Sequence, residues 1–224
     1  MTTDQAVAPP PAGLRERKKR RTRAALVRSA LELFTRNGYD HTTVDEIAEA
    51  VDVSQRTFFR YFANKEEVAF AAQEATDSHF FAALAARPAG ETPLAALRGA
   101  ALDAWDTIGE AVTELVPPDL YMRMYSVIES TPALLAVHLR RTADLEERLA
   151  REIARRGGLD IETDPRPRLV VAAFSGVIRV AGRLWSEGED TSMEALRELT
   201  AFYLDHVGAA LTGHWNDGRN EQQE

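Results

Sequence analysis

Hydrophobic residues recur every three or four positions along most of this chain, which is the spacing of α-helices that bury one face. The first such stripe consists of Leu26, Ala30, Leu33 and Phe34. Asn37-Gly38 follows as a helix stop, because glycine suits the left-handed position after a helix. No stretch alternates cleanly between apolar and polar residues, as half-buried strands do. The pattern therefore predicts an all-helical protein.

Proline, glycine and N-capping residues divide the helical pattern into nine predicted helices. Thr43 and Glu46 have the spacing of a capping box, and Ser54 and Asn64 are N-cap residues for the next two helices. A turn of three or four residues separates the second helix from the third, as in a helix-turn-helix. The predicted helices span 14–36, 44–50, 55–62, 65–86, 94–115, 119–129, 133–155, 168–187 and 193–211.

The third predicted helix, within "SQRTFFRYF", sorts its residues onto two faces. Phe58 and Phe62 are four residues apart and share a face, which we expect to be buried against the first two helices. The other face carries Gln55, Arg56, Phe59 and Arg60. Arginine can donate two hydrogen bonds to guanine, glutamine can pair with adenine, and an aromatic ring can contact a thymine methyl group. This face therefore suits the major groove of DNA.

The charge distribution favours the same interpretation. Net charge is −8, but residues 1–65 contain 12 Lys/Arg and 8 Asp/Glu, whereas the remainder contains 15 and 27. The run "RERKKRRTR" (15–23) has seven cations and one anion. We expect its residues, among them Lys18, Lys19, Arg20 and Arg21, to neutralise phosphates or enter the minor groove. The alternative is a solvated, frayed helix start.

Residues 30–68, "ALELFTRNGYDHTTVDEIAEAVDVSQRTFFRYFANKEEV", resemble the DNA-binding region of the tetracycline-repressor (TetR) family of bacterial regulators. The Gly38-Tyr39 turn, "TTVDEIA", "VS..T" and "YF..K" stand in the family's order and spacing. The segment "SVIESTPALLAVHLRRTADLEERLA" (126–150) looks similar to the C-terminal domain of acyl-CoA-responsive and mycofactocin-type members. The resemblance implies a transcriptional repressor that binds a palindromic operator as a homodimer. It also implies release by a small lipophilic effector, such as an acyl-CoA or another lipophilic anion.

The resemblance also implies which residues contact DNA. The implied contacts are Thr43, Gln55, Arg56, Thr57, Phe59, Arg60, Tyr61 and Lys65, and the helix N-terminus at Ser54 offers further N–H donors for a phosphate. Phe59 departs from the family, which usually has tyrosine there with its hydroxyl on a phosphate. Either Arg60 compensates, or Phe59 contacts a thymine methyl group, or Phe59 is a third core aromatic.

In this family the C-terminal helices bind the effector and form the dimer. Large residues of the middle helices are the pocket candidates, with plain core packing as the alternative for each: Leu102, Trp105, Ile108, Tyr121, Met122, Tyr125, Ile128, Leu135, His138, Phe174 and Ile178. Arginines in apolar segments suit an anionic head group or surface ion pairs: Arg123, Arg140, Arg141 and Arg179. Small and apolar residues of the last two helices are predicted to form a four-helix dimer interface: Ala172, Ser175, Gly182, Leu196, Leu199, Phe202, Tyr203 and Val207.

Other function classes find little support in the sequence. It contains no HExxH, GxGxxG, P-loop or GxSxG motif, its five His show no ligand spacing, and it has no Cys. We therefore expect no catalytic site, metal or cofactor, and a cytoplasmic location; a helical enzyme or partner-binding scaffold is the alternative. The apolar run at 169–178 is too short to span a bilayer and is predicted to be a buried helix. The predicted domains are 14–65 for DNA and 66–213 for effector and dimer, with disordered tails at 1–13 and 214–224.

Overall fold

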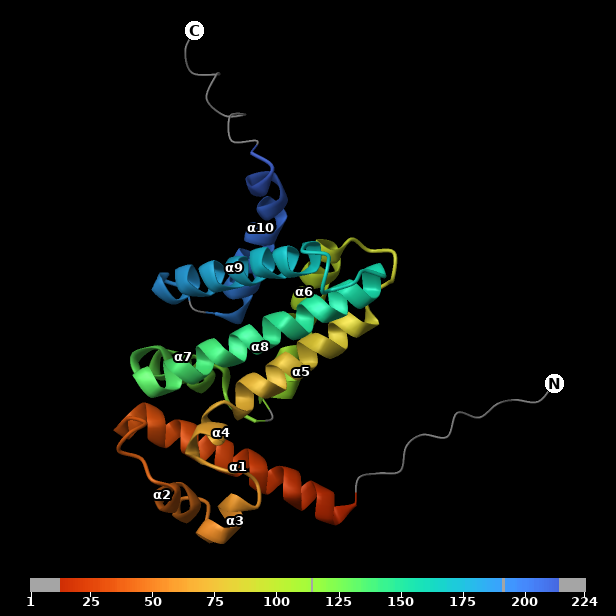
Figure 1. Ribbon diagram of the computed structural model, residues 1–224. Coiled ribbons are helices and arrows are strands. Elements are labelled where there is room, and N and C mark those ends of the chain that lie inside the picture. The colour runs from red at the N-terminus through yellow and green to blue at the C-terminus, as the bar shows by residue number, and fades with distance from the viewer. Residues whose placement is uncertain (1–12, 114, 191, 214–224) are drawn as a thin grey trace, which may run out of the picture. The chain divides into compact units, whose positions relative to one another are not determined.

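The residues described by the computed structural model (13–113, 115–190 and 192–213) form ten α-helices and no strand (Figure 1). The all-helical class is thus confirmed. The helices are α1 (Leu14–Asn37), α2 (Val44–Glu49), α3 (Gln55–Phe59), α4 (Lys65–Ala69), α5 (Ala71–Ala86), α6 (Pro93–Thr113), α7 (Pro118–Ser130), α8 (Pro132–Gly157), α9 (Arg166–Glu187) and α10 (Met193–Leu211). The tails that the sequence predicts at 1–13 and 214–224 lie outside the described residues, apart from Gly13.

The helices divide between two compact units. One contains the chain up to Ala72 together with residues 114–127, and the other contains 73–113 and the chain from Ile128 onward. The first unit thus holds α1 to α4 and most of α7. The second holds most of α5 and all of α6, α8, α9 and α10.

A small aromatic core holds the first unit together. α1 packs against both α2 and α4, and α2 packs against α3. The largest fully buried side chains of this core are Phe34, Phe58, Phe62 and Phe70. Burying four phenylalanines contributes about 1.5–3 kcal/mol each, which is a large share of the stability of so small a unit. The predicted burial of Phe58 and Phe62 is confirmed.

The predicted helix over 65–86 is wrong in one respect, because the structure divides it into α4 and α5. Phe70 leaves the helical region, with φ −98° and ψ 3°, and its N–H donates to the carbonyl of Glu66 at 3.3 Å. Its side chain is fully buried. The break occurs without proline or glycine, and it raises the helix count from the predicted nine to ten within the described residues.

The third helix is also shorter than predicted, ending at Phe59 instead of Phe62. The chain keeps helical hydrogen bonding beyond that point, since the N–H of Phe62 donates to the carbonyl of Phe58 at 3.0 Å. For this reason the two side chains still share a buried face.

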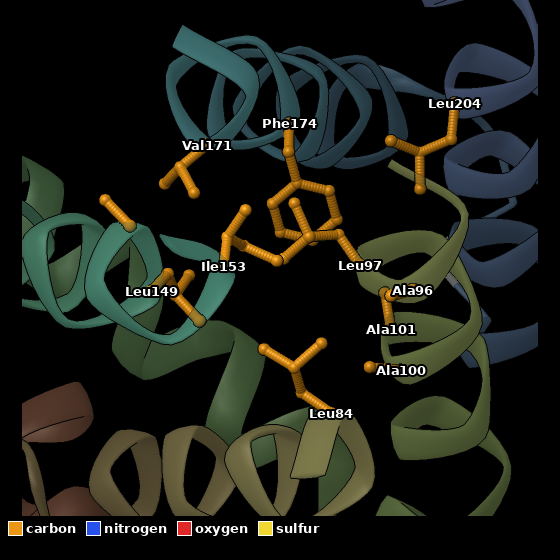
Figure 2. Close-up of a cluster of buried hydrophobic side chains, with 11 residues drawn as sticks. Leu84, Ala96, Leu97, Ala100, Ala101, Leu149, Ile153, Val171, Phe174 and Leu204 are labelled. Atoms are coloured by element: carbon orange, nitrogen blue, oxygen red, sulfur yellow. The ribbon is translucent and has the colours of Figure 1, made fainter. Parts of the chain in front are cut away.

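The core of the second unit is lined by small side chains on α6 and larger ones from its neighbours (Figure 2). Leu84 of α5, Leu149 and Ile153 of α8, and Phe174 of α9 meet there. α6 contributes Ala96, Leu97, Ala100 and Ala101. The small alanines of α6 let neighbouring helices approach closely, and Phe80 and Phe81 of α5 pack against the same cluster.

Polar side chains fix the ends of helices in the same unit. The guanidinium of Arg156 on α8 donates to the carbonyls of Leu84, Arg87 and Pro88 at 3.2, 3.2 and 2.7 Å. The Leu84 carbonyl lies in the last turn of α5, and those of Arg87 and Pro88 directly follow the helix, so Arg156 ties the C-terminal end of α5 to α8. An ion pair between Arg98 and Asp205 at 2.7 Å joins α6 to α10.

α9 is long and apolar enough to cross a membrane by length and composition, and no other helix of the described segments is. It packs against α8 and α10, and its Val171 and Phe174 lie in the core cluster. Leu169 on the same helix is 64% exposed. One side of α9 is therefore buried within the unit while apolar residues remain on another side.

The adjacent residues Phe58 and Phe59 offer a matched test of the first core. Phe58→Ala should lower the free energy of unfolding by about 3–5 kcal/mol, because it empties a fully buried site. Phe59→Ala should cost only about 1 kcal/mol, since the side chain is 50% exposed and loses mainly one ring contact. Urea denaturation followed by circular dichroism measures both, and equal losses would contradict the inward and outward assignment.

Candidate nucleic-acid interface

The start of α3 is fixed by Ser54. Its Oγ accepts a hydrogen bond from the N–H of Thr57 at 3.1 Å and lies 3.0 Å from the Thr57 hydroxyl. This cap satisfies one of the free N–H groups of a helix that is only five residues long. Both predicted DNA-contact side chains are thus engaged with each other in the free protein.

Two buried aromatics fix which face of α3 points outward. Phe58 and Phe62 lie with ring centroids 5.7 Å apart and are almost completely buried. Phe59 is 50% exposed, and its ring rests edge-on against Phe58 at 5.5 Å and 89°. Of the alternatives for Phe59, the core position is therefore wrong. Its side chain is available on the outer face.

The outer face of α3 carries the polar residues that the sequence predicts there. Gln55, Arg56 and Arg60 are exposed. The Arg60 guanidinium lies 5.2 Å from the ring centroid of Tyr61, which is half-buried. Arg23, from the end of the basic run on α1, lies 5.1 Å from the ring centroid of Phe62. Arg60 and Arg23 are thus each held against one of the two aromatic rings that follow α3 in the chain.

The N-terminus of α2 is closed by the predicted capping box. The Thr43 hydroxyl accepts from the N–H of Glu46 at 3.2 Å, and the Glu46 carboxylate accepts from the Thr43 N–H at 2.7 Å and hydroxyl at 2.8 Å. These bonds, aided by the positive charge of Lys65, hold the pKa of Glu46 below its usual value. The ionised carboxylate is therefore part of the cap.

Lys65, the first residue of α4, contacts the turn between α1 and α2. Its ammonium donates to the carbonyls of Tyr39 at 2.6 Å and Thr42 at 2.9 Å. It also lies 4.2 Å from the centroid of the Tyr39 ring. The predicted phosphate contact of Lys65 stays a prediction, but two of its three N–H groups already have partners within the protein.

A shallow hollow beside α3 is lined by acidic residues, opposite in charge to Arg56 and Arg60. It is lined by Asp45, Ala48, Glu49, Asp52, Val53, Ser54 and Gln55. Three carboxylates make this side of the helix-turn-helix unfavourable for phosphates. The side that carries Arg56 and Arg60 is therefore the one that suits a polyanion.

The basic run is helical within the described part of α1. Lys18, Lys19, Arg20 and Arg21 are all exposed, and the Thr22 hydroxyl donates to the carbonyl of Lys18 at 3.0 Å. The run is helical from Leu14 onward and these four cations are exposed, as both the DNA role and the solvated helix start require. Whether these cations contact DNA stays a prediction.

The effector-pocket candidates fall in both units. Tyr121, Met122 and Tyr125 belong to the first unit and the others to the second, and the side chain of Ile108 lies outside the described residues. Phe174 is buried and stacks on Phe80, with centroids 5.7 Å apart at 21°, so it has a packing role. The remaining candidates are buried or half-buried: Leu102, Trp105, Ile128, Leu135, His138 and Ile178. A common cavity stays a prediction.

The arginines proposed to meet an anionic head group differ in their partners and in their exposure. Arg123 pairs with Asp119 at 2.6 Å, and both side chains are largely exposed, which is the surface ion pair proposed as the alternative. Arg140 and Arg179 are exposed, whereas Arg141 is half-buried.

Burial raises the pKa of Asp77 on α5 to about 6, against the lowering influence of Arg148 and Arg141. No periodic pattern along α5 indicates that this carboxyl group points inward.

The dimer candidates are exposed to different degrees. Phe202 is 58% exposed and packs against Tyr203 and His206 on its own helix. Ala172 is exposed, and Ser175, Gly182, Leu199 and Tyr203 are half-buried. Leu196 and Val207 are buried within the unit. α9 and α10 thus retain apolar surface that the single chain does not cover.

Sequence reasoning missed the cluster around Lys65. Tyr39, Thr42 and Glu46 surround the ammonium, yet two of these contribute backbone carbonyls, which leave no mark on residue type. The order of "GY", "TTVDE" and "YF..K" along the chain was the one signal available. As a family pattern, this order does not indicate that Lys65 contacts the carbonyls of Tyr39 and Thr42.

Comparisons with known proteins agree with this geometry. The model of bacterial regulatory proteins of the tetR family matches residues 26–72, and that of the MftR C-terminal domain matches residues 91–212. The HTH-type transcriptional regulator TcmR of Streptomyces glaucescens is 50% identical over 203 residues, covering 91% of this chain and 90% of TcmR. MftR, the proposed mycofactocin biosynthesis transcriptional regulator of Mycobacterium tuberculosis, is 31% identical over 182 residues, covering 81% and 87%.

A solved structure supports the fold. The SmeT–triclosan complex superposes with a TM-score of 0.60 at 19% identity, covering 85% of this chain and 91% of SmeT. Together with the capped α3, its exposed arginines and the two matching domain models, these similarities identify the chain as a member of the TetR family of DNA-binding transcriptional regulators, with a C-terminal domain of the MftR type.

Proposed function

We propose that this protein is a homodimeric repressor that reads a palindromic operator with α3 and is released by a small lipophilic effector. Residues 14–65 bind DNA in this proposal, and residues 66–213 bind the effector and form the dimer. The observation that carries it is the outer face of α3, where Arg56, Phe59 and Arg60 are exposed while Phe58 is fully buried.

The proposed DNA surface combines base and phosphate contacts. Arg56, Arg60 and Gln55 are placed to reach base edges, and Phe59 to contact a thymine methyl group. Phosphates are held by Thr43, Ser54, Thr57 and Tyr61 and by the cations of the basic run. Because carboxylates line the hollow next to Ser54 and Gln55, we place most of the phosphate charge on the side of Arg56 and Arg60.

The exposed apolar surface of α9 and α10 supports the dimer. Leu169 and Phe202 are 64% and 58% exposed. Two copies that pair these helices would bury them in a four-helix bundle with two-fold symmetry. Such a dimer presents two recognition helices about 34 Å apart, one turn of DNA, and so reads an inverted repeat. Repression follows by occupying DNA that polymerase needs.

Release is proposed to occur by a population shift. An effector that binds one conformation of the dimer better than the other lowers operator affinity by its differential binding energy. The route from the effector domain to the helix-turn-helix runs through α5 and α4, which are separate helices joined at Phe70. A coupling of about 1–3 kcal/mol lowers affinity roughly 5- to 150-fold.

Substitution of Arg56 or Arg60 by alanine tests the DNA surface. Each should weaken binding to promoter DNA from beside its own gene by about 1–3 kcal/mol, because one arginine–guanine pair is lost. Fluorescence anisotropy with competitor DNA measures this. Arg36→Ala is the matched control, since Arg36 is exposed in the last turn of α1 and bonds the Asn37 side chain. Unchanged affinity for both α3 variants would reject the surface.

The same assay resolves the contact of Phe59. Replacing operator thymines by deoxyuridine removes only their methyl groups. The wild-type protein should bind the altered operator more weakly, and Phe59→Ala should bind both operators alike. Equal weakening of wild type and variant would assign the methyl contact to another residue.

Phe202→Asp tests the dimer. A charge at the centre of an apolar interface should raise the dimer dissociation constant at least about tenfold. Sedimentation equilibrium should then show the 24.8 kDa chain as a monomer at concentrations where the wild type is dimeric. Leu139→Asp is the control, since Leu139 is 61% exposed on α8, outside the proposed interface. A dimer unaffected by Phe202→Asp would contradict the proposal.

Titration with palmitoyl-CoA tests the effector class. Saturation should lower operator affinity within the range of roughly 5- to 150-fold, whereas coenzyme A alone should have no effect. Calorimetry reports binding independently of DNA. Absence of binding would reject the ligand class, and binding with no change in operator affinity would reject the coupling.

A further inference from the structure

The connection between α1 and α2 is a short turn that requires external support. Gly38 has φ +88°, a left-handed backbone that favours glycine. The Thr42 hydroxyl is buried and donates to the carbonyl of Gly38 at 2.9 Å. Thr43 follows at once and caps α2. The direction of α2, and of the α3 packed against it, therefore depends on where this turn lies.

The support comes from the first residue of α4. The ammonium of Lys65 donates to the carbonyls of Tyr39 and Thr42, at the two ends of the turn, and lies over the Tyr39 ring. Lys65 is 23 and 26 residues away from these partners in sequence. The bonds therefore join α4 to the start of α2 through tertiary structure.

The same ammonium is engaged by groups of the protein itself. Two of its three N–H groups are used by carbonyls, and its charge also acts on the Glu46 carboxylate that completes the capping box. Its surroundings are acceptors and a π-face, each of which stabilises a cation within the protein. A phosphate would have to compete with all of them.

We propose that Lys65 is a positioning residue for operator binding, which holds the α1–α2 turn and the cap of α2 in place from the start of α4. Building on the proposed DNA surface, this assigns to Lys65 a role other than phosphate neutralisation. Any displacement of α4 is then transmitted to α2 by these two hydrogen bonds.

Lys65→Met separates the two roles, because methionine keeps a similar length and removes both donors and charge. A lost phosphate contact lowers the slope of log affinity against log salt by about 0.9. If Lys65 instead acts as a clamp, holding the α1–α2 turn by its two hydrogen bonds, its loss lowers affinity at every salt concentration and leaves the slope unchanged. We expect the second result, with affinity down about tenfold, the factor that follows from losing a hydrogen bond to a charged group. A slope reduced by about 0.9 would overturn the proposal.

Hydrogen exchange tests the clamp without DNA. The N–H groups of Thr43 and Glu46 form the capping box, so their exchange should accelerate about tenfold in Lys65→Met while the core of α1 stays protected. Lys19→Met is the matched control, since it removes an exposed lysine of the basic run and should leave this exchange unchanged. Unchanged exchange in Lys65→Met, or faster exchange with wild-type operator affinity, would each refute the positioning role.

Circular dichroism at the assay temperature would reveal whether Lys65→Met folds. If it does not, Lys65→Arg serves as a second variant. Lys65→Arg keeps the charge but replaces the compact ammonium by a planar fork. Operator affinity should fall about threefold or more with an unchanged salt slope, because the geometry of two carbonyls around one nitrogen is lost. Wild-type affinity would point to charge alone and overturn the clamp. If the wild-type protein forms no specific complex with DNA, the proposed DNA surface is rejected. Hydrogen exchange still tests whether Lys65 holds the α1–α2 turn.

Discussion

The proposed recognition element, α3, is a helix too short to be stable alone. α3 spans five residues, and isolated helices of that length do not persist in water, because nucleation costs more than so few hydrogen bonds return. Its conformation is therefore imposed by two contacts. Ser54 caps its start, and Phe58 anchors it in the core beside Phe62. The outward direction of Arg56, Phe59 and Arg60 follows from that anchor.

Where side-chain spacing carries the information, the sequence predicts the caps of α2 and α3 and the burial pattern of α3 well. The four-residue interval placed Phe58 and Phe62 inside and left Phe59 outside, as the 0%, 1% and 50% exposures bear out. The capping box and both helix caps followed from residue types at fixed offsets. The all-helical fold followed from periodicity alone.

What the sequence could not predict lies in the backbone and in burial. Phe70 interrupts a run of good helix formers with no glycine or proline, so tertiary packing decides the break. Lys65 binds carbonyl oxygens, which every residue has, so nothing in the sequence marks its partners. The inward position of Asp77 likewise depends on how α5 packs, and its helix shows no strong amphipathic stripe to indicate a buried face.

The acidic hollow next to α3 has a kinetic consequence. Its carboxylates and the excess of 27 Asp/Glu over 15 Lys/Arg beyond residue 65 give most of the molecule the same sign as DNA. Long-range repulsion from these carboxylates then opposes encounters with DNA, and attraction depends on the cations of residues 1–65. Sliding and hopping along unrelated sequence rest on such long-range attraction, so they become brief. We therefore expect short visits to unrelated DNA, with residence at the operator set by the proposed base contacts.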